Sequence, residues 1–350
     1  MRPITSILPR TRPNGKGFFV ECHLCQGPTR RFGFNRNGSQ RYRCDACWHT
    51  FTDAQTRPFD RRYLAPEVRV LCLRMLLEGT SVRAVERITG VNRDTILYAV
   101  VDTGTLCKGF LERAIRGVPA FDVQADEIWG FVGCKEKHRL RAGYGEEYGD
   151  AYCFTAIERD TKLILCWHLG KRCPADTRSF ALKLHDATSG RFQLTTDGFT
   201  PYLTNIPAVF GQSIDFATLV KVYGEPEDER RYSPPRVIEV IPTPRIGNPD
   251  PERICTSHVE RHNLTIRMMV RRMTRLTNAH SKKWENHEAA LGLFFAYYNF
   301  CRPHMTLAER ARSEGQRAPK ITPAMAAGLT DHVWSLSELL DRARAERVAA

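Results

Sequence analysis

The sequence contains no long apolar run. No segment of the 350 residues approaches the ~20 consecutive apolar residues that cross a bilayer. The N-terminal stretch from Met1 to Arg10 also lacks an apolar core of the length found in signal peptides. We therefore expect a protein without membrane partners that stays in the cytoplasm.

Acidic residues are scarce relative to basic ones. The 52 Lys and Arg residues outnumber the 39 Asp and Glu residues, which gives a formal net charge of +13. This excess favours a polyanionic partner, with nucleic acid first. Because 42% of the residues are hydrophobic, the chain is not of the disordered class, and its length allows about two or three domains.

The twelve cysteines do not resemble a disulfide framework, because eight of them are scattered among apolar and loop segments. The remaining four form two CxxC pairs, Cys22 with Cys25 and Cys44 with Cys47, separated by eighteen residues. This is the spacing of a zinc ribbon, in which one structural Zn²⁺ is held by four thiolates. A redox pair is the weaker alternative, because two copies occur at ribbon spacing.

A hairpin turn is predicted between the two CxxC pairs, at Asn35–Gly38. So little apolar material lies around it that residues 1–60 should need the metal to fold. Arg41 and Arg43 give this predicted ribbon domain a surface that can contact DNA phosphates.

Residues 61–117 carry a second DNA-binding pattern. Two short helices are predicted on either side of Gly90, in the layout of a helix-turn-helix. Asn92, Arg93 and Thr95 would then read base edges from the second helix. A generic helical hairpin gives much the same pattern, but the neighbouring basic ribbon favours DNA binding.

Three acidic residues lie where a phosphoryl-transfer site needs them. Asp126 sits within the alternating strand pattern of Ala120–Val132, and Asp197 ends the short strand pattern of Phe192–Gly198. Glu260 falls in the first turns of a later helical segment. A buried acid is costly unless a cation offsets its charge, and Mg²⁺ prefers oxygen ligands.

Each acid has an alternative. Asp122 shares the strand face of Asp126 but lies ~13 Å from it at strand rise, so only one of the two can meet Asp197. Glu127 should point to the opposite face and have a supporting or structural role. Glu239 or Glu252 could replace Glu260 if the helix begins elsewhere.

Several blocks of sequence resemble DDE transposases of the insertion-sequence-one type, and they occur in the order of that family. The blocks are Asp126–Trp129, Thr196–Phe199, Val259–Asn263 and Tyr298–His304, with a further resemblance in the ribbon at Gly38–Cys44. The resemblance covers most of the chain from about Ala120 to Leu336. It implies an RNase H-like catalytic domain in which Asp126, Asp197 and Glu260 are catalytic and hold two Mg²⁺ (or Mn²⁺) ions ~4 Å apart.

The same resemblance implies a mixed sheet whose first and fourth strands are neighbours, which would bring Asp126 and Asp197 together. The fold class is therefore α/β (α+β, multidomain), with the catalytic domain at 118–312. Residues 224–255 are rich in Pro, Gly and charge and are predicted to be an inserted loop. Residues 313–350 should form a helical tail that could mediate self-association.

A helix predicted from Ser257 to about Met273 leads into an acid-free basic run. Arg267, Arg271, Arg272 and Arg275 are interpreted as a track for the DNA backbone. An ordinary solvated charged face is the alternative.

The expected function is that of a transposase which binds and cuts double-stranded DNA at element ends and joins it to a target, as a homo-oligomer associated with the nucleoid. One alternative is a transcription regulator whose large domain only oligomerises. A nuclease of the same fold without strand transfer is the other.

Overall fold

The computed structural model of the chain describes residues 20–22, 24–34, 40–52, 64–224, 237–317 and 319–349. The predicted hairpin turn at 35–38 and most of the stretch joining the ribbon to the helices lie outside these residues. The chain divides into two units, Met1–Arg69 and Val70–Ala350. Among the described residues, no helix combines the length and apolarity needed to cross a membrane.

The first unit contains a three-stranded antiparallel sheet, which consists of β1 (Thr29–Phe34), β2 (Gln40–Cys44) and β3 (Thr50–Thr52). Its apolar contacts are few: Tyr42 stacks on Phe51, with 6.1 Å between ring centroids, while Phe34 and Trp48 are exposed. Such a sheet cannot bury enough apolar surface to be stable alone, which is consistent with a fold that a metal completes.

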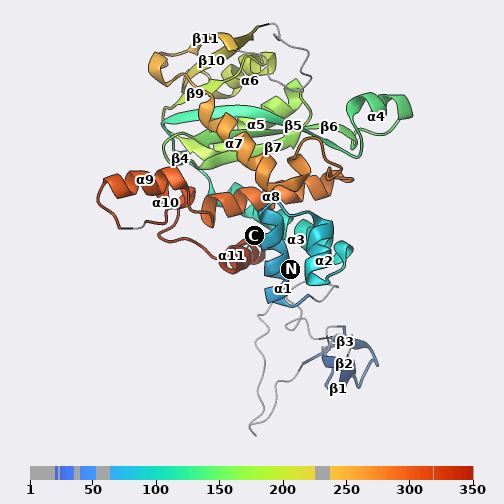
Figure 1. Ribbon diagram of the computed structural model, residues 1–350. Coiled ribbons are helices and arrows are strands. Elements are labelled where there is room, and N and C mark those ends of the chain that lie inside the picture. Colours follow the sequence, from blue (N-terminus) through green and yellow to red (C-terminus); the bar gives the residue numbers. More distant parts are fainter. Residues whose placement is uncertain are drawn as a thin grey trace, which may run out of the picture. The chain divides into compact units, whose positions relative to one another are not determined.

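A six-stranded mixed sheet forms the centre of the second unit (Figure 1). Its strands are β5 (Asp122–Val132), β6 (Gly149–Glu158), β7 (Ile164–Gly170), β9 (Gln193–Thr196), β10 (Asp215–Tyr223) and β11 (Val237–Ile246). The order across the sheet is β11-β10-β9-β5-β6-β7, with β5, β6 and β7 antiparallel and β9 parallel to β5. This is the expected RNase H-like arrangement, in which the first and fourth strands are neighbours.

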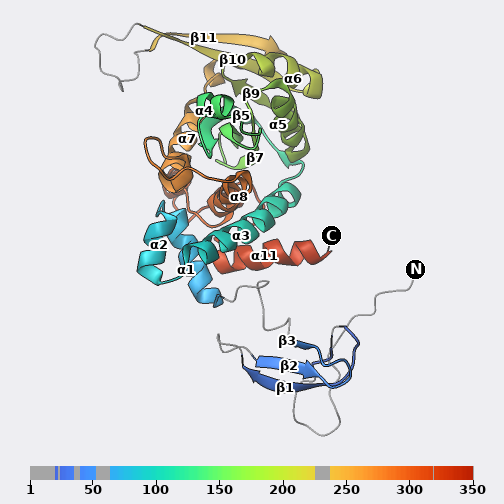
Figure 2. The same cartoon turned by 90° about the vertical axis from the view of Figure 1, so that its right-hand side faces the viewer.

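Helices cover both faces of this sheet. Figure 2 shows α7 (Ser257–Met269) on one side and α5 (Pro174–Ala187) with α6 (Thr200–Phe210) on the other. The central strand β5 is consequently buried on both faces, as Val123, Ala125 and Ile128 show. Two-residue strands β4 (Val118–Pro119) and β8 (Thr188–Ser189) pair in parallel beside the sheet.

A helical layer in the same unit contains the predicted helix-turn-helix. It consists of α1 (Pro66–Leu77), α2 (Val82–Thr89), α3 (Arg93–Ala114) and α8 (Trp284–Phe300). Gly104 lets α3 lie directly on α8, because a Cβ there would be 1.9 Å from the carbonyl oxygen of Ala289. The two helices predicted around Gly90 are α2 and α3, and α3 continues as one helix through the stretch from Thr105 onward.

The C-terminal tail also packs in the second unit. It contains α9 (Met305–Ser313), α10 (Pro323–Ala326) and α11 (Leu336–Ala349). α11 contacts α3 through an apolar face that includes the buried Leu339 and Ala343, and Trp334 stacks on Phe300 at 4.4 Å. Since this face is covered within the chain, it is not free for the self-association that we expected of the tail.

Two further segments differ from expectation. Residues 237–246 form strand β11, paired with β10, whereas we predicted an inserted loop over 224–255. The short helix η2 (Pro251–Arg253) follows it. α7 ends at Met269, earlier than the predicted Met273, and a turn at Val270 leads into η3 (Arg271–Met273). The remaining element is α4 (Glu136–Ala142), which extends from the β5–β6 connection.

Candidate active site and metal centres

The register of two parallel strands brings Asp126 and Asp197 together. Gln124 on β5 pairs with Thr195 on β9, so the residues two positions later on each strand point to the same face. Those residues are Asp126 and Asp197. β9 ends at Thr196, so Asp197 is the first residue after this strand.

Glu127 joins these two acids. The carboxylate oxygens of Asp126, Glu127 and Asp197 lie within 4.8 Å of one another, and we call these three residues the carboxylate cluster. We expected Glu127 on the opposite strand face in a supporting or structural role, and its carboxylate nevertheless lies beside those of the other two acids. Its side chain is only 3% exposed, and it accepts hydrogen bonds from Arg172 Nε at 2.7 Å and from Tyr202 Oη at 3.1 Å.

Asp126 is fixed in orientation by two hydrogen bonds. Its Oδ2 accepts from Asn263 Nδ2 at 2.7 Å, and its Oδ1 accepts from the backbone N–H of Glu127 at 2.8 Å. Asp197 is more open, with a side chain 38% exposed, and its Oδ1 accepts from the backbone N–H of Phe199 at 3.0 Å. Both acids thus keep carboxylate lone pairs that these hydrogen bonds do not use.

Glu260 approaches the cluster from α7 but is not part of it. The start of α7 is held to the same sheet face by the backbone N–H groups of His258 and Val259, which donate to Gln124 Oε1 at 2.9 and 3.2 Å. The Glu260 carboxylate forms an ion pair with Lys221 on β10 and accepts a hydrogen bond from Thr256 Oγ1. Its side chain is 44% exposed.

The electrostatics of the cluster favour a cation. Burial, followed by the neighbouring charge of Asp197, raises the pKa of Asp126 to about 6 and that of Glu127 to about 7. Burial also raises the pKa of Asp197, and the charge of Glu260 adds to this effect. Oxygen donors at this density are the ligands that Mg²⁺ prefers, and a bound divalent ion would offset their repulsion.

The alternative acids have other surroundings. Asp122 is fully buried at the other end of β5 and forms ion pairs with Arg159 at 3.0 Å and Arg253 at 3.2 Å. Its charge is therefore balanced within the protein. Glu239 is exposed on β11 and Glu252 lies in η2, and neither belongs to the carboxylate cluster.

Arg172 is a site residue that the sequence did not reveal. It lies directly after β7, pairs with Glu127, and its Nη2 lies 3.9 Å from the nearest carboxylate oxygen of Asp197. Its guanidinium also packs over the Phe199 ring at 4.1 Å. No sequence pattern marks this position, whereas Asn263 lies in a block that we compared with transposases.

The predicted basic track is only partly exposed. Arg271 and Arg275 are exposed, as a track for a DNA backbone requires. Arg267 instead donates to the carbonyl oxygens of Met273 at 2.9 Å and Trp129 at 3.3 Å, and Arg272 donates to Asn286 O at 2.8 Å. Because α7 ends early, these two side chains turn into the protein and hold the chain after the helix.

The four ribbon cysteines form a second candidate metal centre. The sulfurs of Cys22, Cys25, Cys44 and Cys47 lie within 4.8 Å of one another. Two sulfur pairs are 3.5 and 3.4 Å apart, too long for a disulfide and close to the ~3.8 Å edge of a tetrahedron with ~2.3 Å Zn–S bonds. These four thiols could hold one structural zinc ion.

The backbone around the thiols also fits a metal. The N–H of Cys47 donates to Cys44 Sγ, a contact that favours the thiolate form that zinc binds. A Cβ at Gly27 would lie only 3.2 and 3.3 Å from the sulfurs of Cys25 and Cys44. The backbone at Gly27 therefore runs close to the thiols, where a larger side chain would crowd them.

The residues predicted to contact DNA outside the basic track lie in the ribbon and at the start of α3. In the ribbon, the guanidinium of Arg43 lies over the rings of Trp48 and Phe32, and that of Arg41 also lies over Phe32. At the start of α3, Asn92 and Arg93 are exposed and Thr95 is half-buried. Asn92 Oδ1 caps the helix by accepting from the N–H of Asp94 at 2.8 Å. DNA contact by these residues stays a prediction.

Comparisons with known proteins give only distant similarity. No protein-family model and no curated protein match the chain. Among solved structures, it is similar to a piggyBac transposase in a synaptic complex with hairpin DNA, with 10% identity and a TM-score of 0.37 over 85% of this chain and 77% of that one. It is also similar to an endonuclease V from Bacillus subtilis, with 13% identity and a TM-score of 0.20 over 60% of this chain and 92% of that one.

Proposed function

We propose that the protein is a DNA transposase that binds the ends of an insertion sequence, cleaves them and joins them to target DNA. The observation that carries this proposal is the convergence of Asp126 and Asp197 from neighbouring parallel strands, with Glu127 beside them. A plain scaffold has no reason to bring three mutually repelling carboxylates this close together, whereas metal-dependent phosphoryl transfer needs them.

Asp126, Asp197 and Glu260 would hold two Mg²⁺ (or Mn²⁺) ions. The ions would activate a water or a 3′-hydroxyl as nucleophile and stabilise the departing oxygen. The protein needs no covalent nucleophile for such a reaction, because positioning and charge neutralisation supply most of the rate enhancement.

The chain's own residues position these ligands. Asn263 orients Asp126, while Arg172 and Tyr202 hold the Glu127 carboxylate. Lys221 forms an ion pair with Glu260, which a bound cation would have to replace or share. Supporting contacts of this kind commonly change metal affinity or activity by about 10–100-fold when they are removed.

Of the four proposed domains, 1–60, 61–117, 118–312 and 313–350, the first two would recognise the element ends and the third would contact the DNA backbone. Arg41 and Arg43 of the ribbon would contact phosphates, and Asn92, Arg93 and Thr95 at the start of α3 would read bases. Of the basic track, Arg271 and Arg275 remain available for the DNA backbone. The zinc ion would stabilise the ribbon, and strand transfer between two ends would require a homo-oligomer.

A reaction with end-bearing duplex DNA tests the proposal. The purified full chain with Mg²⁺ should produce nicked ends and joined products, and none of either with chelator. Cleavage without joining would instead identify a nuclease of the same fold. Binding without any cleavage would favour a transcription regulator.

A further inference from the structure

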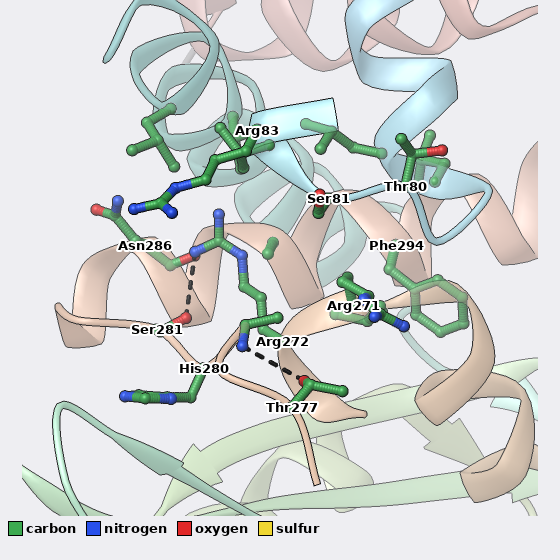
Figure 3. A pocket seen from close by; sticks show the side chains of 18 of the residues that line it. Thr80, Ser81, Arg83, Arg271, Arg272, Thr277, His280, Ser281, Asn286 and Phe294 are labelled. Atoms are coloured by element: carbon green, nitrogen blue, oxygen red, sulfur yellow. Dashed lines mark hydrogen bonds between the residues drawn. The ribbon is translucent and has the colours of Figure 1, made fainter. Parts of the chain in front are cut away.

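A cavity of about 780 Å³ lies in the second unit (Figure 3). Its walls come from the end of α1, the start of α2, the first half of α3, the segment from Met269 to Lys282, and α8. A volume of this size is typical of sites that bind a small organic ligand. The cavity shares no residue with the carboxylate cluster.

The side chains with a fixed charge that line this cavity are all positive. Five of its lining residues carry a fixed positive charge, namely Arg83, Arg93, Arg271, Arg272 and Lys282. Among the described residues that line it, none is an Asp or a Glu. Like charges around one cavity repel one another, so an anion inside it would stabilise the assembled walls.

Arg272 shows this imbalance most clearly. Its Nη1 donates to Ser281 Oγ at 3.2 Å and to the carbonyl oxygen of Asn286 at 2.8 Å, and both acceptors are neutral. Within the described part of the chain, no carboxylate forms an ion pair with Arg272. Burial lowers the pKa of Arg272 to about 10, so it remains charged at neutral pH without a counter-charge.

Arg83 extends from α2 toward the same part of the cavity as Arg272, next to Asn286 (Figure 3). Two guanidinium groups that converge without an acid between them form a fork suited to a phosphate group. Lys282 adds a third cation at the exposed rim.

Part of the lining is apolar, and we call this part the apolar wall. Leu76, Leu97, Val100, Leu293 and Phe294 line it. An inorganic anion would use only the basic side and leave this wall in contact with water. A ligand that joins a phosphate to a flat ring would cover both sides.

We propose that this cationic cavity binds one nucleotide unit, with its phosphate at Arg83, Arg272 and Lys282 and its base against the apolar wall. The nucleotide can be free in solution or part of a DNA strand that reaches the cavity. The inference goes beyond the proposed function, because it assigns a site that neither holds the metals nor requires cleavage.

Binding to the full chain, measured by calorimetry in the presence of chelator, tests the proposal without any contribution from the carboxylate cluster. The probes are a deoxynucleoside 5′-monophosphate, inorganic phosphate and a 5′-phosphorylated tetranucleotide. The variants are Arg83→Ala and Lys282→Ala, both at exposed positions. Their matched controls are Arg87→Ala on the same helix and Lys283→Ala next in the chain, neither of which lines the cavity.

We expect the mononucleotide to bind the wild type, and each cavity variant to weaken this binding by about 10-fold or more. The controls should bind as the wild type does. If the tetranucleotide binds more tightly and displaces the mononucleotide, the cavity takes a unit of a DNA strand; if the two bind equally, it takes free nucleotide.

The proposal is overturned if the wild type binds neither nucleotide probe, or if the controls lose as much affinity as the cavity variants. Inorganic phosphate that binds as tightly as the mononucleotide would remove the role of the apolar wall and overturn the nucleotide assignment. A failure of DNA cleavage in the separate reaction would leave these binding results unchanged.

Discussion

Asn263 follows Glu260 by about one turn of α7 and donates a hydrogen bond of 2.7 Å to Oδ2 of Asp126, the acid at the centre of the sheet. A single helix therefore both presents an acid to the site and orients an acid on the neighbouring strand. This coupling explains why α7 must be held in place by Gln124, whose side-chain oxygen accepts from two N–H groups at the helix start.

The first prediction concerns this contact. Asn263→Ala should lower the rate of Mg²⁺-dependent cleavage by about 10–100-fold while DNA affinity stays unchanged, because Asp126 loses the donor that fixes its orientation. Thr265→Ala is the control, since Thr265 bonds only to a carbonyl of its own helix. Equal rates for Asn263→Ala and wild type would show that the contact has no role in catalysis.

The second prediction concerns the stability of the metal-free protein. The pKa of Glu127 is raised to about 7 in the folded state and is near 4.3 in the unfolded chain. Between these values the folded protein holds a proton that the unfolded chain releases, so stability falls as the pH rises through this window.

Glu127→Gln imitates the protonated acid and removes this loss. In chelator, its melting temperature should exceed that of the wild type by on the order of a few degrees at pH 8, and the two should agree near pH 4.5. Burial lowers the pKa values of His262 and His287 to about 3, which makes stability rise with pH. Both proteins contain these histidines, so the difference between their melting temperatures does not include this effect. A difference that is the same at both pH values would refute the coupling.

The third prediction concerns zinc. The purified full chain should contain one equivalent of zinc, and Cys44→Ser should lose it, because three thiols cannot complete the tetrahedron. Cys134→Ser is the matched control, since Cys134 lies outside the thiol cluster. Metal analysis that finds full zinc in Cys44→Ser would exclude the proposed ligand set.

The fourth prediction separates the basic residues that we first treated as one track. Arg275→Ala should reduce the salt dependence of DNA binding by about one unit of slope, without changing the melting temperature, because an exposed phosphate contact is lost. Arg267→Ala should instead lower the melting temperature, since two partly buried hydrogen bonds to carbonyl oxygens are lost. If Arg275→Ala leaves the salt dependence intact, this part of the chain does not contact DNA.

The sequence predicted the parts of the site that depend on strand periodicity. Alternation in Ala120–Val132 placed Asp126 on a definite face, and the short strand before Asp197 gave its partner. The RNase H-like order of strands then followed from the resemblance of the blocks. These inferences succeed because the register of a sheet allows only one face for each side chain.

The sequence did not predict two features of the site. Glu127 was expected on the opposite strand face, yet its carboxylate lies within 4.8 Å of those of Asp126 and Asp197. Arg267 was interpreted as part of a DNA track, yet it donates to the carbonyl oxygens of Met273 and Trp129. The end of α7 at Met269, after which the chain comes back to Arg267, is not marked by a glycine or a proline in the sequence.

The composition of residues 224–255 led us to predict a loop, which is wrong for residues 237–246. Pro242 and Pro244 suggested a loop, yet both lie in β11. β11 is the edge strand of the sheet, where a missing backbone N–H can face away from the neighbouring strand without loss of a ladder bond. Prolines would argue against a central strand of the sheet, but they are compatible with the edge strand β11.

The measurement that tests the central claim most directly is strand cleavage by Asp197→Asn on end-bearing DNA with Mg²⁺. The amide keeps the shape of the side chain and removes the charge that would hold the metal, so we expect unchanged DNA binding and no detectable nicked or joined product. Asp186→Asn, at an exposed acid on α5, should react as the wild type does. Cleavage by Asp197→Asn at the wild-type rate would contradict the assignment of this site to metal-dependent phosphoryl transfer.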